Sequence, residues 1–220
     1  MLKEQTETQV KSKERVANHG EVYTADREVN AMLDLVKQES ERIDSRFLEP
    51  ACGNGNFLAE VLRRKLNVVG DRYGKSQLEY ERYAVIAVSS IYGIDILEDN
   101  AQECRDRLFK IFDKNYTSLF KDKSKDACRQ SVRYLLKRNI LWGDALDFTN
   151  PETKEPIVFS EWSAVNGSML KRRDYIFRFL VEKTHQYSLF NDEGDAASID
   201  EPVKDFPLIH FLKLGENESN

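Results

Sequence analysis

The sequence has 220 residues, of which 32% are charged and 40% are hydrophobic, and its formal net charge is −5. A chain of this length and composition can bury a sizeable core, and one domain is the simplest expectation. Its longest apolar run, residues 83–97, is too short and too polar to cross a bilayer, and the first residues hold no apolar segment like that of a secretory signal. We therefore expect a cytoplasmic protein without membrane association.

The cysteine and histidine residues argue against a disulfide framework and against a metal site. Cys52, Cys104 and Cys128 form no CxxC pair, and the three histidines are scattered along the chain. Such cysteines suit a reducing compartment, and none of these residues has the spacing of zinc ligands. We expect no metal.

Apolar periodicity divides the chain into alternating strands and helices. Val29, Met32, Leu33 and Val36 recur at helical spacing and predict an early amphipathic helix. Farther along, the sequence predicts strands at residues 46–50, 91–96, 139–146, 155–162 and 206–214, and helices from Asn56 onward and at 76–90, 100–120, 125–138 and 171–185. Strands that alternate with helices form a largely parallel sheet, so we predict an α/β fold that binds ligands at the carboxyl ends of its strands.

A glycine-rich turn follows the first predicted strand. In LEPACGNGNF, residues 48–57, Gly53 and Gly55 allow the backbone to approach a ligand closely and to adopt positive φ. A dinucleotide fold would place a third glycine where this chain has Leu58, and a P-loop would add a Lys-Ser/Thr pair that is missing here. The turn therefore indicates a different ligand.

Three acidic side chains at predicted strand ends indicate what that ligand is. Glu49 could accept a hydrogen bond from an ammonium group, Asp95 from ribose hydroxyls, and Asp144 from an adenine amino group. The Ala145 N–H adds a donor, and the helix start at Asn56 offers free N–H groups to a carboxylate. Ammonium, carboxylate, ribose and adenine together describe S-adenosylmethionine.

Four motifs in the order found in a known family strengthen this interpretation. HGEVYT at 19–24, EPACGNGNF at 49–57, YGIDI at 92–96 and GDAL at 143–146 resemble motifs of class I S-adenosylmethionine-dependent methyltransferases, specifically the adenine-N6 DNA methyltransferases of restriction–modification systems. The resemblance covers about residues 17–162. It implies a Rossmann-like methyltransferase fold with a mostly parallel sheet flanked by helices, here with fewer than the family's usual seven strands.

The resemblance also implies the cofactor contacts and the domain organisation. The residues that match the cofactor motifs are Tyr23, Thr24, Glu49, Pro50, Ala51, Cys52, Gly53, Gly55, Asn56, Phe57, Asp95, Ile96, Asp144 and Ala145. We expect Cys52 to pack rather than to react, because no activating base lies near it in the sequence. One methyltransferase-like domain is expected over residues 19–214, with a helical insertion at about 100–138 and a disordered acidic loop at about 191–203, between a polar arm at 1–18 and a tail at 215–220.

The family's catalytic motif, Asn/Asp-Pro-Pro-Tyr/Phe after the fourth strand, is missing. NPET at 150–153 precedes the predicted strand and lacks the second proline and the aromatic residue. The residues in the corresponding place are Ser160, Glu161 and Trp162, of which Trp162 could stack on an extruded base and the others could accept from its amine. Equally, Trp162 could belong to the core and Glu161 to the surface.

Three functions remain open at this point. The chain could be a compact DNA methyltransferase that transfers a methyl group to adenine N6 in a restriction–modification or phage-defence system. It could instead be an inactive cofactor-binding subunit of a larger complex, in which a partner subunit supplies target recognition. It could also methylate a substrate other than DNA.

Two basic segments are candidates for binding DNA phosphates. They lie between Lys121 and Arg138 and at residues 171–173, on a chain that is acidic as a whole. The candidate residues are Lys123, Lys125, Arg129, Arg133, Arg138, Lys171, Arg172 and Arg173. The alternative is that these side chains form ordinary solvated helix faces.

A short motif near the C-terminus suggests a further partner. QYSLF at 186–190 resembles the peptide by which bacterial proteins bind the replication sliding clamp, although Tyr187 replaces the usual leucine. In such a peptide Leu189 and Phe190 would enter an apolar pocket while Gln186 would form a hydrogen bond at its rim. Leu189 and Phe190 could instead pack on the domain itself.

Overall fold

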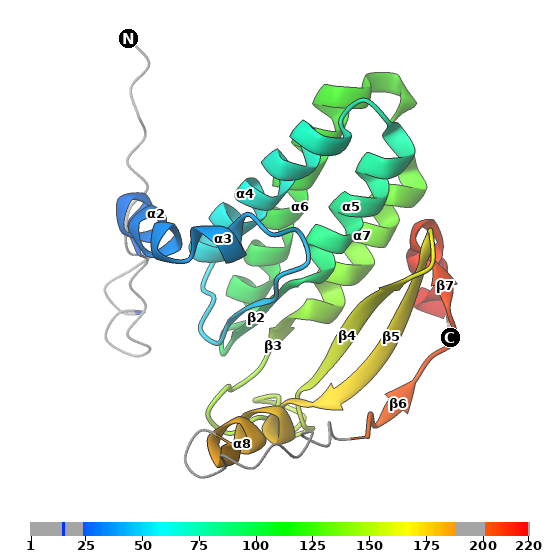
Figure 1. Ribbon diagram of the computed structural model, residues 1–220. Helices are drawn as coiled ribbons and strands as arrows, with labels where there is room; N and C mark the ends of the chain where they lie inside the picture. Colours follow the sequence, from blue (N-terminus) through cyan, green and yellow to red (C-terminus); the bar gives the residue numbers. More distant parts are fainter. Residues whose placement is uncertain (1–14, 16–23, 188–200, 220) are drawn as a thin grey trace.

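The computed structural model describes residue 15, residues 24–187 and residues 201–219 (Figure 1). Its centre is a parallel sheet of three strands in the order β1-β2-β3, which span Phe47–Glu49, Ile91–Asp95 and Ile140–Trp142. All residues of β2 are buried, as expected of a central strand with both faces covered. The predicted α/β organisation with parallel strands is therefore confirmed.

Four long helices cover one face of this sheet and form the main core. They are α4 (Asn56–Tyr73), α5 (Gln77–Ser89), α6 (Glu98–Phe120) and α7 (Asp126–Asn139), which Figure 1 shows packed side by side. In α4, Leu58, Leu62 and Leu66 recur at intervals of four residues and are almost completely buried, so one stripe of the helix faces the core. The helices predicted from Asn56 onward and at 76–90, 100–120 and 125–138 are thus confirmed.

The opposite face of the sheet carries a smaller apolar cluster. Tyr92 and Ile94 point to this face and pack with Ile157, Phe159 and Phe177. Successive side chains of a strand point to opposite faces, which explains why the neighbouring Ile91 belongs to the helical core. The two faces of the sheet are therefore covered unequally.

A second sheet, which is antiparallel, follows the first in the chain. It consists of β4 (Val158–Val165), β5 (Met169–Ile176), β6 (Lys204–Asp205) and β7 (Ile209–His210). The β4–β5 hairpin packs beside α5 and α7, and α8 (Phe177–Tyr187) follows it directly (Figure 1). The remaining elements are α2 (Asp26–Leu35), α3 (Lys37–Ser40), and the 3-10 helices η1 (Lys121–Lys123) and η2 (Phe211–Ser219).

This second sheet overturns three predictions. The fourth strand does not extend the parallel sheet, because β4 pairs with β5 along its whole length. Residues 171–176 form a strand rather than the start of a helix, since Arg172 and Asp174 point inward together and neutralise each other. Residues 206–214 form no continuous strand, because Pro207 lacks the N–H that a sheet ladder requires.

Smaller differences from the predictions concern the early helix and the acidic loop. Val29 and Leu33 of the early helix are buried as expected, whereas Met32 and Val36 are about half exposed. Most of the predicted acidic loop lies outside the described residues.

Among the helices that the structure describes, none is long and apolar enough to cross a membrane.

One buried lysine ties the helical layer to the start of the sheet. Lys65 of α4 is fully buried, and its ammonium group donates to the backbone oxygens of Arg42, Ile43 and Ser45 and to Oγ of Ser90. These acceptors lie just before β1 and β2. These four acceptors replace part of the hydration that the ammonium group loses, and burial lowers the pKa of Lys65 to about 7.

We predict that Lys65→Met lowers the free energy of unfolding by about 3 kcal/mol. The substitution keeps the apolar stem but leaves buried carbonyl oxygens without a donor, at about 1–3 kcal/mol for each unsatisfied group. Urea unfolding of both proteins measures the difference. Lys75→Met, at an exposed position, is the control and should change the value by less than about 0.5 kcal/mol; equal losses in both variants would contradict the anchoring role.

Candidate cofactor site

A cleft of about 540 Å³ lies at the carboxyl ends of β1, β2 and β3. The cofactor residues predicted from the sequence line this cleft, with two exceptions. Gly55 lies against Cys104 of α6, and Tyr23 lies outside the described residues. The cleft also includes Leu97 and Asn100, which the sequence did not single out, and Met32, Gly143 and Leu146, which were not named there as cofactor contacts. Asn100 had a recognisable signal, because it is a polar residue in the first turn of the helix after Asp95.

The glycine turn has the backbone geometry that its sequence indicates. Gly53 and Gly55 have φ values of 53° and 84°. A Cβ atom on Gly55 would lie 2.6 Å from Sγ of Cys104, which belongs to α6. A glycine is therefore required at position 55 for two reasons: the backbone has a positive φ, and α6 leaves no room for a Cβ atom.

Asp95 holds this turn in place. Its Oδ2 accepts from the Gly53 N–H at 2.8 Å, and its Oδ1 accepts from the Leu97 N–H at 2.9 Å and from Nδ2 of Asn100 at 3.2 Å. An ionised carboxylate has about four lone-pair sites, so these three donors leave about one for a ligand. The side chain thus joins the ends of β1 and β2 and still lines the cleft.

Asn56, the first residue of α4, connects three segments around the cleft. Its Nδ2 donates to the backbone oxygen of Thr24 at 3.2 Å, and its Oδ1 accepts from Arg107 of α6. The N-terminal N–H groups of a helix have no partner within the helix and carry partial positive charge. The start of α4 can therefore hold an anionic group.

Glu49 supplies negative charge to the cleft. Its side chain is half-buried, and burial raises the pKa of its carboxyl group above the usual value. Within the described part of the chain, no donor forms a hydrogen bond with this carboxylate. A desolvated carboxylate without a partner favours a cation beside it.

Asp144 follows β3 and lines the cleft there. Its Oδ1 accepts from the N–H groups of Leu146 and Asp147, at 2.8 and 3.3 Å, which fixes the orientation of the side chain. No described residue donates to its Oδ2. This oxygen is an acceptor that a ligand amino group can use.

Cys52 lines the cleft without being a nucleophile. The thiol is buried against Cys104, and this hydrogen-bonded neighbour and burial both raise the pKa of Cys52. Only the thiolate form reacts as a nucleophile, and that form is suppressed here.

The catalytic candidates Ser160, Glu161 and Trp162 do not line the cleft. Their predicted place after a fourth parallel strand is wrong, because all three lie within β4 and β4 belongs to the antiparallel sheet. The indole N–H of Trp162 donates to Asn139, whose own Nδ2 donates to the backbone oxygens of Ser89 and Ile91, 3.1 Å away in each case. Trp162 therefore sits at the amino-terminal edge of the parallel sheet, opposite the cleft.

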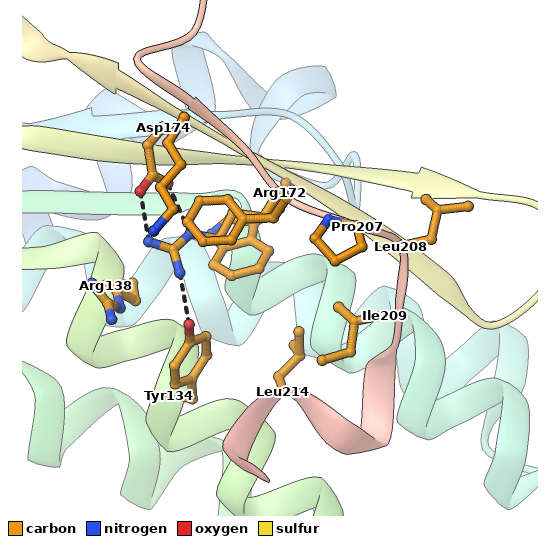
Figure 2. A pocket seen from close by; sticks show the side chains of 11 residues that line it. Tyr134, Arg138, Arg172, Asp174, Pro207, Leu208, Ile209 and Leu214 are labelled. Atoms are coloured by element: carbon orange, nitrogen blue, oxygen red, sulfur yellow. Dashed lines mark hydrogen bonds and ion pairs between the residues drawn. The ribbon is translucent and has the colours of Figure 1, made fainter. Parts of the chain in front are cut away.

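Trp162 instead borders a separate pocket of about 620 Å³ (Figure 2). Figure 2 shows Arg172 at its centre, between Asp174 and Tyr134. The guanidinium group donates to both oxygens of Asp174, at 2.7 and 2.8 Å, and to Oη of Tyr134 at 2.8 Å. Ser160 also donates to Asp174, and Glu161 forms an ion pair with Arg46.

Most of the proposed phosphate-binding residues have carboxylate partners. Arg172 is buried, so its predicted contact with a phosphate is wrong. The other ion pairs are Lys125 with Glu81, Arg129 with Asp113, Lys171 with Asp205, and Arg173 with Glu161 and Asp205. Lys123, Arg133 and Arg138 are exposed, and Arg133 and Arg138 lie against the rings of Phe109 and Tyr134.

The proposed clamp-binding residues are only partly described. Gln186 belongs to the last turn of α8. Leu189 and Phe190 lie outside the described residues.

Comparison of the chain with protein-family models, with curated proteins and with solved structures finds no match. What the cleft can bind is therefore argued from its own residues.

We predict that Gly55→Ala destabilises the protein more than Gly167→Ala. Both glycines have positive φ, which costs a residue with a Cβ atom about 1–2 kcal/mol, but only the Cβ atom at position 55 meets another side chain. Thermal or urea unfolding of the two variants measures the difference, for which we expect at least another 1 kcal/mol, about the lower end of overpacking costs. If both variants lose the same stability, the contact with Cys104 is unimportant.

Proposed function

We propose that the cleft binds S-adenosylmethionine and that the chain is the cofactor-binding component of an adenine-N6 DNA methyltransferase. The observation that carries the proposal is the meeting of Glu49, Asp95 and Asp144 in one cleft at the ends of three neighbouring parallel strands. Open α/β sheets bind ligands at this edge.

Each polar part of S-adenosylmethionine has a matching group in the cleft. The Glu49 carboxylate suits the ammonium group, and the free N–H groups at the start of α4 suit the carboxylate of the methionine part. The remaining lone pair of Asp95 suits a ribose hydroxyl, and Oδ2 of Asp144 suits the adenine amino group. The side chains of Met32, Phe57 and Ile96 supply apolar walls between these polar contacts.

The bound cofactor would supply an electrophilic methyl group on sulfur, and transfer then depends mainly on the alignment of the acceptor. The described residues of the cleft serve the cofactor, whereas the residues at the expected catalytic position lie elsewhere. This separation favours a cofactor-binding subunit over a complete enzyme. DNA as the target rests on the resemblance of the four sequence motifs.

We expect the isolated chain to bind S-adenosylmethionine and Glu49→Gln to weaken the binding at least about tenfold. The amide keeps the shape of the side chain but cannot neutralise the ammonium group, and a hydrogen bond between charged partners contributes about 1.5–3 kcal/mol. Isothermal titration calorimetry gives both dissociation constants. Glu152→Gln, at an exposed position outside the cleft, is the matched control; an equal effect of both substitutions would contradict the role of Glu49.

The same carboxylate makes the affinity depend on pH. Burial raises the pKa of Glu49 above 4.5, and the ammonium group binds best to the ionised form. The affinity for S-adenosylmethionine should therefore fall as pH decreases from 7 through this raised pKa, and it should be regained when pH returns to 7. Titrations at several pH values should show a flatter profile for Glu49→Gln, and parallel profiles would contradict this assignment.

We further expect the isolated chain to transfer no methyl group to unmethylated DNA at concentrations at which it binds the cofactor. Glu161→Ala and Trp162→Phe should leave the affinity for S-adenosylmethionine within about twofold, because neither side chain lines the cleft. A methyl-transfer assay with labelled cofactor tests both statements. Transfer by the isolated chain that Glu161→Ala abolishes would instead make residues 160–162 catalytic.

A further inference from the structure

One residue of the predicted polar arm, Arg15, contacts the domain beside the cleft. Its guanidinium group forms a bidentate pair with Asp99, from Nη1 to Oδ2 at 2.6 Å and from Nη2 to Oδ1 at 3.0 Å. Nη2 also donates to Oδ1 of Asn100 at 3.2 Å. Both acceptors lie in the first turn of α6, 84 and 85 residues farther along the chain. At this residue the arm is therefore joined to the domain that it was expected to precede.

The bond to Asn100 has more weight than the ion pair with Asp99. The side chain of Asp99 is 53% exposed and that of Arg15 is 25% exposed, and an ion pair that is open to water contributes little. Asn100, in contrast, is 1% exposed and lines the cleft. A hydrogen bond between a charged donor and a buried acceptor is stronger than the same bond in water.

Asn100 connects Arg15 to Asp95. Its Oδ1 accepts from Arg15, and its Nδ2 donates to Oδ1 of Asp95 at 3.2 Å. A guanidinium group only donates and an ionised carboxylate only accepts, so a single orientation of the amide satisfies both partners. Arg15 thus fixes the amide, and the amide holds one of the two oxygens of Asp95.

We propose that Arg15 is a positioning residue of the cleft, which holds Asn100 and through it keeps Asp95 oriented with an acceptor position open to a ligand. Arg15 itself does not line the cleft, and its charge is directed at Asp99, so it acts on the ligand through these other residues. That the ligand group at Asp95 is a ribose hydroxyl rests on the function proposed above.

Hydrogen exchange of the backbone, without any ligand, tests the network alone. The Gly53 N–H donates to Oδ2 of Asp95, whereas the Phe47 N–H donates to the Ser90 oxygen at the start of β1. Arg15→Met should speed exchange at Gly53 at least about fivefold and leave Phe47 within about twofold, as expected for partners in one hydrogen-bond network. Unchanged exchange at Gly53, or an equal increase at Phe47, would overturn the proposal.

A matched control removes another arginine that forms an ion pair. Arg63 of α4 pairs with Glu60 and does not line the cleft. Arg63→Met should leave exchange at both Gly53 and Phe47 within about twofold of the unmodified chain, because no shared partner couples Arg63 to Asp95. An increase at Gly53 equal to that caused by Arg15→Met would mean that the effect is not specific to Arg15.

Two ligands that differ only in the ribose hydroxyls test the role in cofactor binding. S-adenosylhomocysteine, the product of methyl transfer, carries both hydroxyls, whereas its 2′,3′-dideoxy analogue offers none to Asp95. Arg15→Met should weaken binding of the first ligand at least about fivefold and that of the second less than about twofold, as measured by calorimetry. Equal losses for the two ligands, including no loss for either, would overturn the proposal.

The exchange and binding measurements separate this inference from the proposed function. An unmodified chain that binds neither S-adenosylmethionine nor S-adenosylhomocysteine, but in which Arg15→Met speeds exchange at Gly53 alone, would overturn the proposed function and leave the link from Arg15 to Asp95 standing. A chain that binds both ligands, but in which Arg15→Met leaves Gly53 unchanged, would overturn only the present inference.

Discussion

The bonds between Asp95 and the glycine turn organise the cleft at the carboxyl ends of the parallel strands. A single carboxylate at the end of β2 receives the Gly53 N–H from the loop after β1, and the Leu97 N–H and Asn100 side chain from the start of α6. Three segments that are distant in sequence are thereby fixed around one point. The carboxylate is buried, so these hydrogen bonds are stronger than they would be in water and their loss would be costly.

This arrangement also explains the tight packing behind the cleft. With the turn held against Asp95, Gly55 lies so close to Cys104 of α6 that it has no room for a side chain. The helix α4 can then begin directly at Asn56, with its first N–H groups at the cleft. Glu49 and Oδ2 of Asp144 add acceptors to the cleft that no described residue uses.

The second sheet depends on a different interaction, the buried pair of Arg172 and Asp174. An isolated buried charge is strongly unfavourable, but here both charges share two hydrogen bonds, and Ser160 and Tyr134 satisfy further donors and acceptors. This network joins β4 to β5 and the hairpin to Tyr134 of α7.

The sequence by itself determined the elements whose signals are local. Helical spacing predicted α4 to α7. The glycine turn and the acids at the strand ends predicted one cleft, because consecutive parallel strands bring their carboxyl ends to one edge, and the resemblance of the four motifs named the other residues that line it. Only the tertiary structure decided where β4 pairs, that residues 171–176 are a strand, and that Trp162 lies opposite the cleft. These outcomes depend on long-range contacts, above all on Asp174 as the partner of an inward-facing Arg172, and the local pattern of charges around residues 171–173 predicts a solvated helix equally well.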